Sequence, residues 1–141
     1  MSGRIAALSL LLSLIAVSGR AEELFTADSK TLGSSKMDIV ITEIERRPRV
    51  SVLDIKINNV GSSVGSSFFL LCSIRKLGLL RGGYHHIVKL EQFPKRNQMT
   101  VAFLERQDEN ISSFGPEFAK LPSGTDAVDL EPFAEICGVQ K

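Results

Sequence analysis

The sequence lacks an excess of charge of either sign. Its 141 residues include 17 basic and 16 acidic side chains. Arg4 and Arg20 lie in a segment that we expect to be removed, so the remaining chain is also close to neutral. Binding to nucleic acid depends on neutralising many phosphates, which requires a clear surplus of Lys and Arg. The composition therefore predicts no nucleic-acid partner.

The sequence also lacks the short motifs of common cofactor sites. The run NNVGSSVGSS at residues 58–67 has neither the GK[ST] nor the GxGxxG spacing of phosphate-binding loops. No CxxC or HxxxH pair is present to hold a metal ion. Asp126, Asp129 and Glu131 do not fit the spacing of an EF-hand loop. We therefore predict no cofactor, no metal and no catalytic residue from motifs.

The first apolar run is too short for a permanent membrane anchor. Arg4 precedes an apolar stretch at residues 5–17, about 13 residues against the roughly 20 that a transmembrane helix needs. Small residues and Ala21 follow, which completes the pattern of a secretory signal peptide. We expect residues 1–21 to be cleaved off, with a cut after Gly19 as the alternative. The mature protein is then secreted or periplasmic and not an integral membrane protein.

Cysteine is scarce, and the two that are present allow one pairing. Exported proteins pass through an oxidising compartment, so Cys72 and Cys137 are predicted to form a disulfide bond. A closed loop of this length stabilises a fold by roughly 4 kcal/mol in the chain-entropy model. The alternative is two reduced thiols, one of them buried.

What remains is a single domain preceded by a short arm. Residues 22–36 are polar and contain Gly33-Ser34-Ser35, so they are predicted to be a flexible N-terminal arm. Residues 37–141 are predicted to form one α+β domain. Within it, residues 37–45 and 50–58 alternate β-branched and polar residues, which is typical of strands.

These two strands are predicted to form a hairpin around residues 45–49. The apolar residues pair best when Ile41 lies opposite Leu53 and Ile44 opposite Val50. In this register both breaks of the alternation fall together, which favours a β-bulge.

A long apolar helix is predicted at residues 63–81. Serine at its start is typical of N-caps, and Gly82-Gly83 is typical of a helix end. The helix is apolar on two sides, so both sides need a cover. We expect one face to lie on the sheet, formed by Leu70, Ile74 and Leu77. We expect the other face to lie under the C-terminal segment, formed by Phe68, Cys72 and Leu79.

The second half of the chain predicts a further hairpin and a short helix. Residues 84–92 and 98–106 are predicted strands, and residues 128–137 a short helix. The predicted fold class is α+β, with a mostly antiparallel four-stranded sheet and the long helix packed on one face. The C-terminal helix is strapped over that helix by the disulfide bond, and the order of the hairpins in the sheet stays open.

Two clusters deserve consideration as sites. Arg46, Arg47 and Arg49 gather at the hairpin turn, which predicts either a small anion-binding site or a solvated hairpin end. His85 and His86 are weak candidates for a metal ligand or a general base. Adjacent residues of a strand point to opposite faces, so the two rings are poorly placed to share one metal ion.

The central module resembles small uncharacterised bacterial periplasmic or envelope proteins. The likeness covers residues 49–90, where a strand RVSV leads into a helix that ends at Gly83-Tyr84 and then into a strand HHIVKL. The sequence departs from that group in lacking a lipobox cysteine and in having Cys-Ser-Ile-Arg at the helix centre. The resemblance implies a periplasmic location and an α+β sandwich, and it implies no catalytic residues.

The leading functional hypothesis is an exported, non-enzymatic binding or assembly factor. Its partner would be an unknown protein or a cell-envelope component. The alternative is a small hydrolase or metal-dependent enzyme that uses His85 or His86. A thiol-based redox protein is a third hypothesis, and it requires an accessible Cys72 of low pKa.

Overall fold

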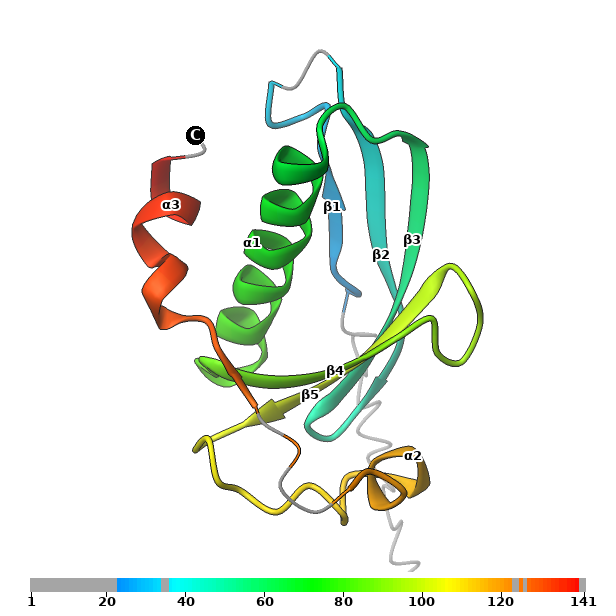
Figure 1. The fold of residues 1–141 in the computed structure, drawn as a ribbon, viewed down its shortest axis with the longest axis vertical. Coiled ribbons are helices and arrows are strands. Elements are labelled where there is room, and N and C mark those ends of the chain that lie inside the picture. Colours follow the sequence, from blue (N-terminus) through cyan, green and yellow to red (C-terminus); the bar gives the residue numbers. More distant parts are fainter. Residues whose placement is uncertain (1–22, 34–35, 123–124, 126, 140–141) are drawn as a thin grey trace, which may run out of the picture.

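The structure, a computed structural model, describes residues 23–33, 36–122, 125 and 127–139. The predicted signal peptide lies outside the described residues. The elements are, in chain order, β1 (Thr26–Asp28), β2 (Asp38–Arg47), β3 (Val50–Asn59), α1 (Ser63–Gly82), β4 (His86–Glu91), β5 (Gln98–Leu104), α2 (Pro116–Ala119), β6 (Val128–Asp129), the 3₁₀ helix η1 (Glu131–Phe133) and α3 (Ala134–Val139). Figure 1 shows α1 lying along one face of the sheet, with α3 on the side of α1 that is turned away from the sheet.

The α+β class is confirmed, but the predicted number of strands is wrong. The described chain forms a six-stranded sheet in the order β1-β2-β3-β5-β4-β6, and every neighbouring pair is antiparallel. The two extra strands lie at the edges: β1 falls within the predicted arm and β6 within the predicted C-terminal helix. With three and two residues, they are too short to show an alternating pattern in the sequence.

The first hairpin forms as predicted, in a different register. Ile41 lies opposite Ile55 and not opposite Leu53. The cause is the turn: Arg47 pairs with Val50, so only Pro48 and Arg49 connect the two strands. The shift is by two residues at Ile41, where the same side chains still face the core, and by three at Val50, beyond the bulge.

The predicted bulge in this hairpin is confirmed. The pairing shifts between Glu43 and Glu45, and the residue between them, Ile44, is exposed. The bulge restores the alternation that Ile44 interrupts in the sequence. Glu43 precedes the bulge and lies on the same inward face as Ile39 and Ile41, which matters for the buried ion pairs described below.

The ends of α1 follow from its capping residues. The Ser62 hydroxyl accepts a hydrogen bond from the Gly65 N–H at 3.0 Å, which satisfies one of the free donors of the first turn. Gly83 adopts the left-handed conformation at φ 77°, and its N–H donates to the carbonyls of Gly78 and Leu79. The helix therefore ends within one residue of its predicted bounds.

The orientation of α1 agrees with the prediction at Ile74 and Leu77, which are buried, and it differs in detail at Leu70 and Leu79. Its buried residues are Phe69, Ser73, Ile74, Leu77 and Gly78. Phe69 takes the place expected for Leu70, which is only partly buried, and Leu79 is 38% exposed. A helix that is apolar on two sides has no single dominant face, so its sequence fixes its rotation only approximately. Among the described helices, α1 alone has the length and composition of a membrane span, as core helices of soluble proteins also do.

Strand β5 is buried on both of its faces. Met99, Val101 and Phe103 alternate along the strand and point into the core beneath α1. Ala102 and Leu104 point to the opposite face, where they pack in a second apolar cluster. That cluster is completed by residues from the long segment after β5 and from α2, which are Ile111, Phe114, Phe118 and Leu121.

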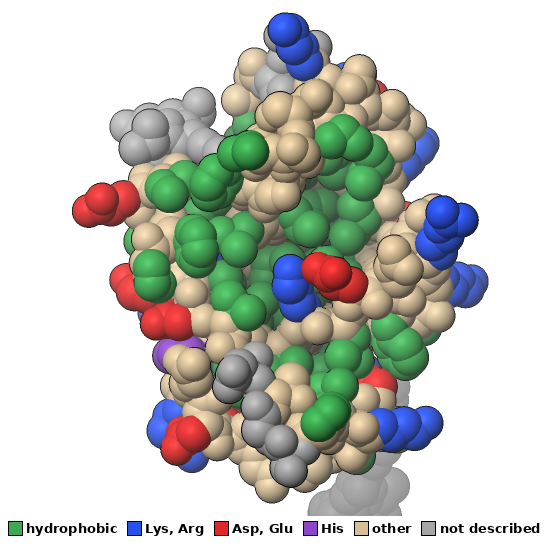
Figure 2. Space-filling view, in the orientation of Figure 1, with side chains coloured by type: hydrophobic (Ala, Val, Ile, Leu, Met, Phe, Trp, Pro, Cys, Tyr) green, Lys and Arg blue, Asp and Glu red, His purple; other side chains and the backbone are tan. Residues whose placement is uncertain are grey.

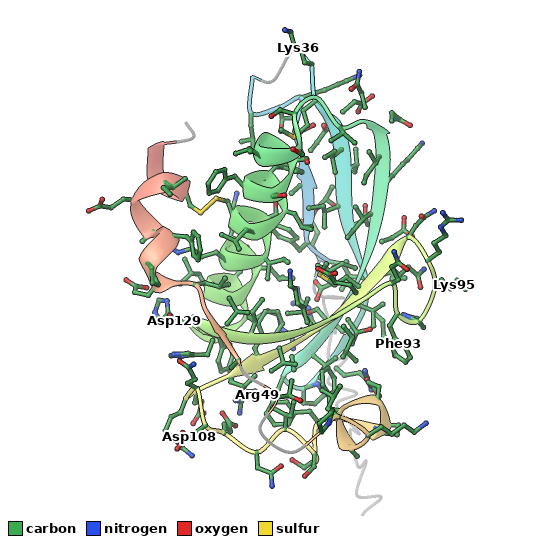
Figure 3. The ribbon with its side chains drawn as sticks, in the orientation of Figure 1. Lys36, Arg49, Phe93, Lys95, Asp108 and Asp129 are labelled. Atoms are coloured by element: carbon green, nitrogen blue, oxygen red, sulfur yellow. A yellow bond between two sulfur atoms is a disulfide. The ribbon has the colours of Figure 1, made fainter. Side chains whose placement is uncertain are left out.

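The disulfide bond between Cys72 and Cys137 is present as predicted. It joins the middle of α1 to α3, and it is the yellow bond between the two helices in Figure 3. The C-terminal helical segment is shorter than predicted. Its first residues form β6 against β4, with Ile87 opposite Val128.

Candidate functional site

The three arginines of the hairpin turn all contact carboxylates. Arg46 pairs with Glu43 at 2.6 Å and Arg49 with Glu109 at 2.7 Å. Arg47 pairs with Glu117, which belongs to α2. An external anion would have to displace one of these carboxylates. Arg47 and Arg49 also connect the turn to distant parts of the chain, whereas Arg46 pairs within its own strand.

Arg49 lies at the centre of this arrangement (Figure 3). Its backbone is left-handed at φ 64°, and its Nε donates to the Phe103 carbonyl at 2.8 Å. The guanidinium carbon lies 4.8 Å from the ring centroids of both Tyr84 and Phe114. Contacts of this kind with aromatic faces are attractive for a cation. Arg49 therefore links the turn to α1's end and to the segment after β5.

The acids that pair with the turn have lowered pKa values. Burial raises the pKa of Glu109, and the hydrogen bonds from Arg49 and from the Glu105 N–H outweigh it. Burial also raises the pKa of Glu117, and the hydrogen bond from Arg47 outweighs it. Both pKa values lie below the ordinary value, so both groups are carboxylates at neutral pH.

Glu43 is a buried carboxylate that the sequence analysis did not single out. Its carboxyl group accepts hydrogen bonds from Arg46, from the Ser51 hydroxyl and from the Phe25 N–H. Arg81 of α1 also contacts this cluster, and its Nη1 donates to the Ser51 hydroxyl oxygen at 2.6 Å. Burial raises the pKa of Glu43, and the hydrogen bonds from Arg46, Ser51 and Phe25 lower it further than burial raises it. The cluster joins β1, β2, β3 and α1, which is a structural role.

The two histidines lie at the start of β4, close to carboxylates of the C-terminal segment. His85 Nδ1 is 2.8 Å from Glu131 Oε2, a close contact that is poorly aligned for a hydrogen bond. His86 Nε2 is 3.9 Å from Asp129 Oδ2. In the described part of the chain, no group of three His, Cys, Asp or Glu side chains is placed to hold a metal ion.

A cavity of about 330 Å³ lies between β1, α1 and the disulfide bond. We call it the disulfide pocket. Its apolar wall is formed by Phe25, Ala27, Leu32, Phe69, Leu79, Cys72 and Cys137. Its polar groups are Thr26, Asp28, Thr31, Ser73, Arg75 and Lys76. The volume is at the lower end of the range of about 300 to 1,000 Å³ for small-ligand sites.

One side of the disulfide pocket is the free edge of a strand. β1 is the first strand of the sheet, and among the described residues it pairs with β2 alone. The Phe25 carbonyl accepts from the Glu43 N–H, and the Ser29 N–H donates to the Ile39 carbonyl, so these residues face β2. Backbone groups alternate in direction along a strand. Thr26 therefore directs its N–H and carbonyl away from β2, toward the pocket side.

The charges at the disulfide pocket are unevenly placed. Lys76 projects from α1, and in the described part of the chain it makes no ion pair. Its neighbour Arg75 lies 4.0 Å from Glu131. Asp28 lies at the opposite wall, on β1, where its Oδ1 accepts from the Lys30 N–H. The α1 side of the pocket is thus positive and the end of β1 is negative.

Apolar surface is also exposed on the other side of α1. Figure 2 shows hydrophobic side chains gathered in a hollow between α1 and the strands β2 and β3. A cavity of about 400 Å³ lies between the first half of α1 and Phe133. Its lining is Ser63, Val64, Ser67, Phe68, Leu71 and Phe133. It has no charged side chain, so the disulfide pocket is the better candidate for selective binding.

Comparison with protein families, with curated proteins and with solved structures finds no match to this chain. The residues of the disulfide pocket therefore have to be judged from their own geometry. Of these residues, sequence reasoning found the disulfide and Leu79, and it missed Thr26 and Lys76. The only signal for Lys76 in the sequence was its position as a charged residue within a mostly apolar helix.

Proposed function

We propose that this chain is an exported, non-enzymatic binding protein that uses the disulfide pocket to hold a protein or cell-envelope component. The observation that carries the proposal is a combination of three features in one place: an apolar cavity, a strand edge that no described residue pairs with, and a lysine that forms no ion pair with a described acid. Each of these features costs stability or solubility when nothing covers it.

The surface around the disulfide pocket supports the proposal. Leu32 and Leu79 line the pocket and are 46% and 38% exposed. Leu80, the next residue of α1, is 67% exposed, and Ile136 of α3 is 44% exposed. Single exposed leucines are ordinary, but Leu32 and Leu79 border the same cavity from different parts of the chain, and apolar surface gathered in one place is typical of an interaction site.

The export part of the proposal rests on the N-terminal sequence, and the disulfide bond is consistent with it. Mass spectrometry of the protein isolated from its own host tests it. We expect a chain that begins at Glu22 and lacks two hydrogens relative to the reduced form. A chain that still carries residues 1–21 in the cytoplasmic fraction would contradict export.

Site-specific photo-crosslinking tests the binding site. We would place benzoylphenylalanine at Leu79, in the pocket, and at Lys95, an exposed residue of the β4–β5 turn (Figure 3). In the native host, a discrete adduct is expected from position 79 and none from position 95. The same adducts from both positions, or none from either, would overturn the proposal.

The second candidate is a small hydrolase, and the close contact of His85 with Glu131 favours it. A carboxylate close to an imidazole stabilises the imidazolium that forms when the imidazole acts as a general base. Neither histidine lines the disulfide pocket, so this activity would need a site of its own. Hydrolysis of a nitrophenyl ester by the purified protein tests it. Loss of turnover in His85→Gln, with His86→Gln as the matched control, would favour the hydrolase over the binding protein.

A further inference from the structure

We infer that the ligand of the disulfide pocket is an extended peptide segment that pairs with the free edge of β1, places one apolar side chain in the pocket and directs an acidic side chain toward Lys76. The inference rests on the proposed function and goes beyond it by naming the class of ligand. Three independent features of the described residues support it: the backbone of β1, the lining of the pocket and its charges.

The backbone of β1 provides the first argument. Thr26 turns its N–H and carbonyl toward the pocket, which is the pair of groups that an added strand uses. The next outward carbonyl, that of Asp28, already accepts from the N–H and the hydroxyl of Thr31. The open part of the edge is therefore short and centred on Thr26, which suits a few residues of extended chain.

The lining of the pocket provides the second argument. Phe69 and Leu79 of α1 stand beside this edge, and the disulfide forms the far wall. Successive side chains of an added strand point to opposite faces, so alternate side chains would point toward α1. A cavity of about 330 Å³ takes one large apolar side chain of the peptide and leaves its neighbours outside.

The charges provide the third argument. Lys76 is exposed on the α1 side of the pocket, and no described acid pairs with it. Asp28 at the end of β1 disfavours an acid at that wall. The complementary peptide therefore carries Asp or Glu next to its apolar anchor, on the side of α1. A fatty acid shares the apolar chain and the carboxylate, but it leaves the strand edge unused.

Selection of short random peptides displayed on phage, with the mature protein as bait, tests the inference. A peptide with an apolar residue next to Asp or Glu is expected. Its affinity is then measured by fluorescence polarisation against Thr26→Pro and Thr26→Val. Proline removes only an N–H that faces away from β2, which an edge strand tolerates, and valine keeps it. We expect binding about tenfold weaker in Thr26→Pro and unchanged within about twofold in Thr26→Val.

A charge exchange tests the role of Lys76. Lys76→Glu should lower the affinity for the acidic peptide about tenfold. A peptide with Lys in place of its acidic residue should bind the Lys76→Glu variant as the acidic peptide binds the wild type. Lys95→Glu, on the exposed β4–β5 turn, should leave both affinities unchanged. Near-ultraviolet circular dichroism of each variant verifies that it is folded.

Three results would overturn the inference, and they have different consequences for the proposed function. Peptides that bind Thr26→Pro and Lys76→Glu as tightly as the wild type, but not Leu79→Asp, refute strand addition and leave the pocket as a binding site. Oleate binding to the wild type and not to Leu79→Asp, with no peptide selected, assigns the pocket to lipid. Peptides that bind Leu79→Asp unchanged refute both the inference and the pocket as the binding site.

Discussion

Glu43 shows how much of this fold depends on a single side chain. It is 1% exposed, and it accepts hydrogen bonds from the backbone of the residue before β1, from β3 and from its own strand. Removing one partner of a buried charge pair is costly, because the other partner stays buried with less compensation.

We expect Glu43→Gln to lower the free energy of unfolding by about 3 to 5 kcal/mol, as measured by urea denaturation. Glu45→Gln is the matched control, because Glu45 lies in the same strand with its side chain 56% exposed and 3.9 Å from Arg47. Its effect should stay within about 0.5 kcal/mol. Equal effects of the two substitutions would contradict the role assigned to Glu43.

Single residues also explain why the hairpin register was mispredicted. The turn is tight because Arg49 takes a left-handed backbone, which is uncommon for a residue with a side chain. The contacts that hold it there come from Phe103 and Glu109, more than fifty positions along the chain. No local pattern around residue 49 contains that information, so the alternation of apolar residues gave the faces and missed the register.

At the scale of elements, α1 is held by close backbone contact as well as by apolar packing. Gly78 is buried in the helix, and a Cβ at this position would lie 2.8 Å from the carbonyl oxygen of Tyr84 and 3.5 Å from the Phe103 ring. The helix can approach the start of β4 so closely only because the residue has no side chain.

Gly78→Ala should therefore be destabilising, although alanine is the better helix former. Helix propensity favours the change by about 1 kcal/mol, and the steric conflict should reverse this to a net loss of about 1 to 3 kcal/mol. Gly138→Ala in α3 is the control, because a Cβ there has no atom within 4 Å. Thermal unfolding of both variants decides the point, and a stabilised Gly78→Ala protein would refute the close contact.

The pairing of α3 with α1 is the second dependence between elements. The cysteines are separated by 65 positions, so their bond removes much conformational freedom from the unfolded chain. We expect Cys137→Ser to lower the stability by roughly 4 kcal/mol, and reduction of the wild-type protein to have a similar effect. An unchanged melting temperature in both cases would show that α3 contributes little to holding α1.

Elements differ in how well the sequence predicts them, for a physical reason. The caps of α1 and the strand β5 depend on local signals, and both were predicted correctly. β1 has three residues, and side-chain hydrogen bonds on either side of it hold it against β2. The Glu43 carboxylate accepts from the Phe25 N–H before β1, and the Ser29 hydroxyl after β1 accepts from the Ile39 N–H. The walls of the disulfide pocket come from β1, α1 and α3. Since β1 was not predicted, the pocket could not be predicted either.

At the scale of the whole molecule, arginine–glutamate pairs connect the turn between β2 and β3 to the segment that covers the opposite face of the sheet. Arg47 and Arg49 reach Glu117 and Glu109, and that segment contributes Phe118 to the second apolar cluster. The attachment of this segment to the β2–β3 turn therefore depends on the ionisation of Glu109 and Glu117.

This dependence predicts a loss of stability in acid. The pKa values of Glu43, Glu109 and Glu117 are all lowered in the folded state from the ordinary value of 4.5. Groups of this kind stabilise the fold above the pKa of the unfolded state and stop doing so as the pH falls through the folded pKa. The free energy of unfolding should be nearly constant from pH 7 to about pH 5 and should decrease below about pH 4.5. A stability that is unchanged at pH 3 would contradict these ion pairs.

The bond between Cys72 and Cys137 also makes part of the chain a covalent ring. The ring contains the second half of α1, the β4–β5 hairpin, α2 and β6. A protease that cuts the exposed segment between β5 and α2 opens the ring without separating the protein into two pieces. The product should run as one species on a non-reducing gel and as two after reduction. In an environment rich in proteases, a cut there would still leave every wall of the disulfide pocket attached to the same molecule.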